Sequence, residues 1–213
     1  MAVKSEREYR DMTMEIRSAE NEEVEQEERK IVTGYASTFN EPYTLYEDDD
    51  WRFNEVVDSK AFDNTDMSDV IMQYDHEGRV FARMSNNTLT VIPDERGLLI
   101  EADLGGTELG RQLYEEIRGG YTTKMSFGFT VDGEVETKEK VDGIEVYTRT
   151  ITSVRKLYDV SAVSIPANDA TSISVRNLTD GVIEKIQAER LEAEALELRR
   201  RKLLVRAKLN GGQ

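Results

Sequence analysis

The chain has 213 residues, of which 38% are hydrophobic and 33% are charged, and its formal net charge is −15. This length is enough for one packed domain with an appendage, and the acidic charge argues against nonspecific binding to nucleic acid or to anionic membranes. The chain has no cysteine and one histidine, which excludes disulfides, thiolate catalysis and zinc sites built from cysteines or several histidines.

Residues 1–29 are highly charged and weakly patterned. They predict a partly mobile N-terminal segment with one short strand at about residues 12–17, followed by an acidic loop. The opening "MAVKSEREYR" lacks the apolar core of a signal peptide, and no apolar run approaches the roughly 18 residues that a membrane span needs.

Residues 30–104 read as a series of short strands. "KIVTGYASTF" alternates between apolar and polar residues, and "DVIMQYDHEGRVFARM" predicts a strand, a loop and a second strand. "TLTVIPDERGLLIEADL" predicts a hairpin around the turn residues 93–97. The acidic run at residues 47–50 is typical of a solvated turn rather than a cation site.

"TELGRQLYEEIRGG" is the clear helix in the middle of the chain. Thr107 can accept a hydrogen bond as the N-cap, and Gly119 and Gly120 mark the end. Leu109 and Ile117 lie eight residues apart, with Leu113 midway between them, and predict the buried face.

Residues 122–167 predict an opening strand followed by a second hairpin. In "TTKMSFGFTV" apolar residues alternate with small or polar ones, and two Asp-Gly pairs, at 132–133 and 142–143, are hairpin turn signals. Many short strands with few helices predict a mainly β, α+β fold over residues 30–178. We expect a closed or nearly closed antiparallel barrel with packed helices.

Residues 179–213 differ in composition from the preceding domain. They are rich in Glu, Leu, Ala and Arg and contain no proline, and Asn210-Gly211-Gly212 lies near their end, so they predict one long C-terminal helix. The apolar positions keep no clean heptad, which favours packing on the chain's own domain or on a partner chain over an autonomous coiled coil.

His76, in "QYDHEGR", is the only histidine that could serve as a general base near neutral pH. The simpler interpretation of a histidine between two acids and before a glycine is a polar loop residue. The local sequence leaves both interpretations open.

Ser126, in "KMSFGF", is turned by alternation away from the apolar side of its strand. Most strand serines are passive. Gly128 lies two residues further on the same face, and its missing side chain would let a substrate backbone approach a nucleophilic hydroxyl.

Asp159, in "RKLYDVSAVSIPA", shares a strand face with Leu157, Val163 and Ile165 if the alternation is regular. A carboxylate on an apolar face needs a partner. One interpretation is a structural ion pair with a residue such as Arg155, and the other is an acid that orients an imidazole.

Five segments in this order resemble the prohead protease family of tailed bacteriophages, serine proteases related in fold to the herpesvirus assemblin proteases. They are "GYASTF", "YDHEGRVFAR", "ERGLLIEADL", "LYEEIRGGYTTKMSFGF" and "LYDVSAVSIPA", and the resemblance covers about residues 12–178. It implies an assemblin-type barrel, with His76, Ser126 and Asp159 as the catalytic residues and neither metal nor cofactor. For the oxyanion and substrate region we expect Arg118, Gly119, Gly120 and Gly128.

The resemblance also implies the biological setting. The expected substrates and partners are the major capsid protein precursor or scaffold protein, and the protease itself, inside the procapsid in the host cytoplasm. Self-association is a further expectation, and neither nucleic acid nor membrane is expected as a partner. The alternative from another class is a non-enzymatic scaffold or virion structural protein that acts through its long C-terminal helix.

Overall fold

The computed structural model describes residues 7–12, 17–18, 29–164, 185–193, 195–197 and 199–200. The chain divides into two units, Met1–Val175 and Arg176–Gln213, which are treated separately below. In the second unit the described residues, from Lys185 to Arg200, are helical, in agreement with the predicted C-terminal helix. Within the described residues, no helix is long and apolar enough to cross a membrane.

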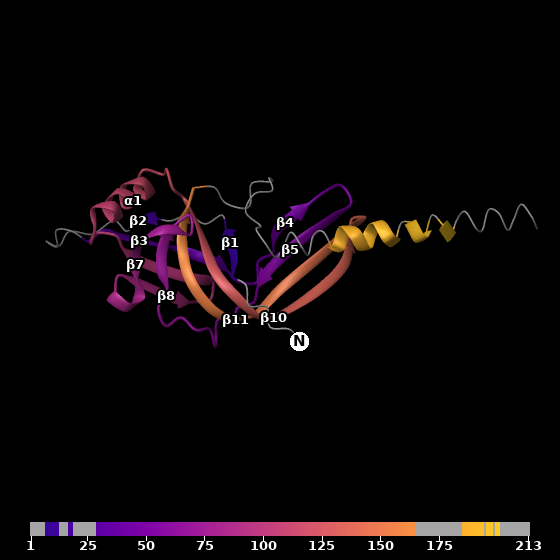
Figure 1. Ribbon diagram of the computed structural model, residues 1–213, viewed down its shortest axis with the longest axis horizontal. Helices are drawn as coiled ribbons and strands as arrows, with labels where there is room; N and C mark the ends of the chain where they lie inside the picture. Colours follow the sequence, from indigo (N-terminus) through magenta and orange to yellow (C-terminus); the bar gives the residue numbers. More distant parts are fainter. Residues whose placement is uncertain are drawn as a thin grey trace, which may run out of the picture. The chain divides into compact units, whose positions relative to one another are not determined.

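A long hairpin organises the first unit. Its strands are β10 (Lys124–Val141) and β11 (Ile144–Val163), which run side by side as two curved ribbons (Figure 1). The main sheet has the order β1-β10-β11-β5-β4, and β6 and β7 continue it beside the C-terminal half of β11. The other strands of this sheet are β1 (Glu8–Met12), β4 (Tyr43–Glu47), β5 (Trp51–Val57), β6 (Ile71–Tyr74) and β7 (Glu77–Arg83).

A second, smaller sheet has the order β2-β3-β9-β8. The predicted hairpin around residues 93–97 is confirmed as the antiparallel pair of β8 and β9. A short 3-10 helix, Met84–Asn86, leads from β7 into this sheet. The strands of this second sheet are β2 (Arg17–Ser18), β3 (Ile31–Thr38), β8 (Leu89–Pro93) and β9 (Gly97–Asp103).

The mainly β fold with few helices is confirmed, but the strand arrangement differs from the predicted antiparallel barrel. The described strands form two sheets and no closed barrel. Two pairings are parallel, because β11 runs alongside β5 and β6 in the same direction. Sequence periodicity reports which face of a strand is buried and not which neighbour it pairs with, so it does not distinguish these topologies.

One apolar core lies beneath both sheets and the helix α1 (Glu108–Arg118). The Thr107 hydroxyl accepts a hydrogen bond from the Gly110 amide at 2.9 Å, which confirms the predicted cap. The buried helix face combines Gly110, Leu113, Tyr114 and Ile117, whereas Leu109 is exposed, so the predicted face was rotated by about one residue. β10 contributes Met125, Phe127 and Phe129 to the same core.

The two Asp-Gly pairs have different roles. Asp142 and Gly143 have φ values of 52° and 92° and form the tight turn between β10 and β11, as predicted. The prediction of a turn at Asp132 and Gly133 was wrong, because β10 continues through both residues with register shifts around Gly133. A glycine inside a strand is often the mark of such an irregularity.

The first strand begins earlier than the sequence pattern predicted. β1 occupies Glu8–Met12 and pairs antiparallel with β10, so these charged residues form the edge of the main sheet. Residues 13–16, within the predicted strand, lie outside the described ranges. The sequence pattern misplaced this strand because β1 directs charged side chains into the protein. A search for alternating apolar residues does not detect such a strand.

Candidate active site

His76 lies in the two-residue turn between β6 and β7. Asp75 and His76 both have positive φ values, 48° and 59°, as a tight hairpin of this kind requires. The Asp75 amide donates to the Ala162 carbonyl at 2.9 Å, and the Asp75 carboxylate accepts from the amide and hydroxyl of Ser164. These bonds fix the turn against the end of β11, and they hold the histidine in a conformation that non-glycine residues seldom adopt.

Ser126 lies in the N-terminal part of β10, between the buried residues Met125 and Phe127. Because side chains alternate along a strand, the apolar residues fill the core and Ser126 lies on the opposite face, as predicted. It pairs with Ser161 of β11 on one side and with Asp11 of β1 on the other. The nucleophile candidate is therefore held by a strand that has a neighbour on each side.

Asp159 reaches the same face as Ser126 because β11 contains a bulge. Gly128 pairs with Asp159, whereas the next residue of β10, Phe129, pairs with Leu157. Tyr158 is thus an extra residue, and it reverses the alternation between Leu157 and Asp159. The expectation that Asp159 shares a face with Leu157 was wrong, and Ile165 lies outside the described residues.

The structural partner considered for Asp159 is engaged elsewhere. The Arg155 guanidinium donates to the Asp132 carboxylate at 2.7 Å. Asp159 is fully buried, and its Oδ1 atom instead accepts hydrogen bonds from His76 and, at 2.9 Å, from the Ser161 hydroxyl. The buried carboxylate is therefore held by donors from the β6–β7 turn and from β11 itself.

The structure brings the three predicted residues into one chain of hydrogen bonds. His76 Nδ1 lies 2.5 Å from Asp159 Oδ1, and His76 Nε2 lies 2.6 Å from Ser126 Oγ. With the proton on Nδ1, the imidazole donates to the carboxylate and accepts from the hydroxyl. This arrangement, an acid that orients a base hydrogen-bonded to a serine, is the one that activates a hydroxyl nucleophile.

Ser126 Oγ has a second acceptor within reach. The Arg10 carbonyl oxygen of β1 lies 2.9 Å from it. A hydroxyl has one proton to donate, so the Arg10 carbonyl competes with His76 for that proton. Ser126 also has no exposed surface, so a substrate reaches Oγ only after a displacement within the site.

The space beside Gly128 is filled from within the protein. A Cβ atom at this position would meet the Asp159 carboxylate and would lie 2.8 Å from Cε1 of Tyr9. The expectation that Gly128 leaves room for a substrate backbone was therefore wrong. Its missing side chain makes room for the carboxylate and for the tyrosine ring.

The residues expected near the oxyanion, at the end of α1, have other partners. The Arg118 side chain is exposed and pairs with Glu115 at 3.5 Å. The amides of Gly119 and Gly120 donate to helix carbonyls, at 2.8 and 3.0 Å, and so close the C-terminus of α1. In this conformation neither amide is available to an oxyanion.

Tyr9 of β1 and Arg7, the residue just before β1, contact the site and were not predicted. The Tyr9 ring packs against the His76 imidazole, with centroids 4.4 Å apart and planes tilted by 57°. The Arg7 guanidinium lies 3.7 Å from Asp159 Oδ2 and 3.8 Å from the centre of the Tyr158 ring. Only the pairing of β1 with β10 brings these residues here, and no local sequence pattern indicates that pairing.

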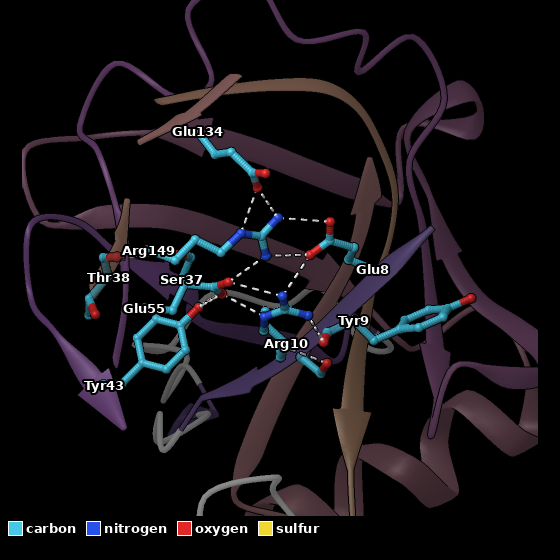
Figure 2. A network of polar contacts seen from close by, with 10 residues as sticks. Glu8, Tyr9, Arg10, Ser37, Thr38, Tyr43, Glu55, Glu134 and Arg149 are labelled. Carbon is cyan, nitrogen blue, oxygen red and sulfur yellow. Dashed lines mark hydrogen bonds and ion pairs between the residues drawn. The ribbon is translucent and has the colours of Figure 1, made fainter. Parts of the chain in front are cut away.

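A buried cluster of charges lies on the opposite face of β1 (Figure 2). Arg10 Nε and Nη2 donate to the two oxygens of Glu55, at 2.5 and 2.9 Å, and Arg10 Nη2 also donates to Glu8 at 2.6 Å. Arg149 Nη1 bridges Glu8 and Glu55 at 2.6 and 2.7 Å. The two arginines balance the two glutamates, so this core of the cluster is neutral.

Two further residues complete this buried cluster. The Tyr43 hydroxyl donates to Glu55, and Glu134 accepts from Arg149 Nε at 2.7 Å. Burial acts to raise the pKa of Glu55, but Arg10 and Arg149 outweigh burial and hold that pKa below its ordinary value. Burial raises the pKa of Tyr43 well above its ordinary value. Glu55 is therefore charged and Tyr43 neutral at neutral pH.

No group of three or more metal-ligating side chains lies together within the described part of the chain. The sequence model of one protein family, described as caudovirus prohead serine protease, matches residues 13–184. A search of curated proteins and a search of solved structures each found no match.

Proposed function

Because the chain belongs to the caudovirus prohead serine protease family, whose members mature phage capsids, we propose that it is an endopeptidase with Ser126 as its nucleophile. The observation that carries this proposal is the position of His76, within hydrogen-bonding distance of both Ser126 and Asp159. The family gives the reaction class, and this geometry is the basis for assigning the residues.

In the proposed reaction Ser126 Oγ attacks the scissile carbonyl carbon while its proton passes to His76 Nε2. The imidazolium is stabilised by Asp159, and it returns the proton to the leaving amine as the carbon–nitrogen bond breaks. A water molecule then attacks the acyl-enzyme with His76 as base, which releases the acid product and restores the serine. One histidine is sufficient for both half-reactions.

The proposed substrates are the scaffold protein or the scaffolding segment of the major capsid protein precursor, and the protease itself. The proposed location is the inside of the procapsid in the host cytoplasm. We assign to the C-terminal extension, residues 179–213, either docking to a precursor or removal by self-cleavage. Deletion of this extension, with precursor processing and protease incorporation into procapsids as readouts, tests that assignment, and no change in either would contradict it.

The test of the enzyme proposal is incubation with the capsid protein precursor of the same phage, followed by mass spectrometry of the new termini. We expect cleavage by the wild-type protein and none by Ser126→Ala. A folded wild-type protein that leaves the precursor intact and does not react with a serine-directed phosphonate would favour the non-enzymatic scaffold alternative.

A further inference from the structure

β1 belongs to the active-site region although it precedes the residues that the family model matches. Its register with β10 places Tyr9 opposite Gly128, two pairs away from Asp11, the partner of Ser126. Since side chains alternate along β1, Tyr9 lies on one face while Glu8 and Arg10 lie on the other. Figure 2 shows this division, with the Tyr9 ring directed away from the buried cluster.

The Tyr9 ring lies in the space left by the missing side chain of Gly128 in β10. Gly128 has no side chain, and a Cβ atom there would lie 2.8 Å from Tyr9 Cε1 and 3.1 Å from Cδ1. From this space the ring contacts the imidazole of His76, whose side chain is only 13% exposed. The tyrosine thus forms a wall along one side of the imidazole.

The orientation of the imidazole must be maintained because its two nitrogens have different partners. Nδ1 must face Asp159 while Nε2 faces Ser126, so a rotation of the ring breaks both hydrogen bonds together. His76 lies in a hairpin turn, and loops are ordinarily more mobile than the strands they join. A ring packed at 4.4 Å opposes this rotation by direct contact.

The opposite face of β1 holds Tyr9 in place. Glu8 and Arg10 flank Tyr9 in the sequence, and both are buried in hydrogen-bonded ion pairs with Arg149 and Glu55. Moving β1 would leave these charges without partners in a buried site, which is strongly unfavourable. Tyr9 therefore packs against His76 from an anchored position.

From these contacts we infer that Tyr9 is a positioning residue for the catalytic histidine. Its ring keeps the His76 imidazole aligned between Asp159 and Ser126. The inference rests on the proposed function, since alignment has consequences for catalysis only if His76 is the base. Tyr9 takes no part in proton transfer, and its hydroxyl is not required.

The first measurement reports on the imidazole directly and does not depend on catalysis. The chain has one histidine, so its ¹⁵N ring resonances are assigned without ambiguity in an untagged protein. In the wild type we expect the shifts of a single tautomer with the proton on Nδ1. In Tyr9→Ala we expect shifts averaged between tautomers, whereas Tyr9→Phe, which keeps the ring, should match the wild type.

The second measurement is the rate at which a serine-directed phosphonate labels Ser126. We expect Tyr9→Ala to label about 10–100-fold more slowly, because a misplaced catalytic group costs about this much, and Tyr9→Phe to label at the wild-type rate. Tyr147→Ala is the matched control, since Tyr147 is a half-buried tyrosine on β11 that packs on Trp51 at 5.7 Å. This control should label at the wild-type rate.

The outcomes separate the inference from the proposed function. If the wild type labels and Tyr9→Ala labels as fast or faster, Tyr9 only covers the site and the inference is wrong. If the folded wild type does not label, the proposed function fails, and the ¹⁵N spectra still show whether Tyr9 orients the imidazole. If Tyr9→Ala does not fold, Tyr9→Leu, which keeps apolar bulk without a flat ring, replaces it in both measurements.

Discussion

The Asp159 carboxylate lies where a side chain at Gly128 would stand, and the two residues are direct partners across β10 and β11. The bulge at Tyr158 turns Asp159 toward this space, and the glycine leaves the space open. The acid can approach His76 at 2.5 Å because both conditions are met on neighbouring strands.

The first prediction concerns Gly128→Ala. The new methyl group would overlap the carboxylate and the Tyr9 ring, so we expect precursor cleavage to fall by about 100-fold, as for other misplaced catalytic groups, with a lower melting temperature. Gly106→Ala is the control, because a Cβ atom there meets nothing within 4 Å. Wild-type cleavage by Gly128→Ala would mean that Asp159 and Tyr9 can move without consequence for the reaction.

The second prediction concerns the proposed triad of Ser126, His76 and Asp159. Ser126→Ala should abolish both labelling and cleavage, and Asp159→Asn should lower turnover by on the order of 10⁴-fold, since an amide favours the wrong histidine tautomer. Single-turnover kinetics on a peptide from the precursor measures this loss. A loss below about tenfold in Asp159→Asn would remove Asp159 from the assignment, because replacing the orienting acid of a triad lowers turnover far more than this.

The third prediction concerns the pH dependence of kcat/KM. His76 must be neutral to accept the serine proton. We expect kcat/KM to rise with pH through one ionisation. A rate that is constant from about pH 5 to 8 would contradict the assignment of an imidazole base.

The fourth prediction concerns the stability of the buried cluster. Glu55→Gln leaves Arg10 and Arg149 without their shared carboxylate, and breaking a buried ion pair costs about 3–5 kcal/mol of unfolding free energy. Arg155→Gln is the control, because it breaks an exposed pair with Asp132 and should cost less than about 1 kcal/mol. Urea unfolding measures the loss of unfolding free energy in both variants. Similar losses would mean that burial does not determine the cost of breaking an ion pair in this protein.

The fifth prediction concerns acid. Arg10 and Arg149 hold the pKa of Glu55 below its ordinary value of 4.5, so the folded protein binds this proton less readily than the unfolded chain. The stabilisation is complete above that value and is lost as the pH falls below it. Between neutral pH and about pH 3, the unfolding free energy measured with urea should therefore decrease less in Glu55→Gln than in the wild type. Equal decreases would mean that other carboxylates dominate.

Local patterns predicted the features that depend on residues close in sequence. The cap at Thr107, the hairpin at residues 93–97 and the turn at Asp142 each depend on a few neighbouring residues. The alternation around Ser126 correctly separated the hydroxyl from the core. The match to the family over residues 13–184 confirms the resemblance read from the motifs.

Features that depend on pairing between distant strands were not predicted. The bulge that reorients Asp159 exists only in the register of β10 against β11, and the parallel neighbours of β11 have no local signature. Tyr9 was overlooked because its strand consists mostly of charged residues. The charges of Glu8 and Arg10 are buried by partners from β5 and β11, more than 40 positions away in the sequence.

The complete burial of Ser126 sets a limit on how the site can be used. A nucleophile that solvent does not reach reacts only in the fraction of molecules that are open, so an observed acylation rate is the intrinsic rate multiplied by that fraction. A partner that binds the open form would accelerate the proposed reaction without touching His76 or Asp159. The proposed triad would then be slow in dilute solution and fast wherever such a partner is concentrated.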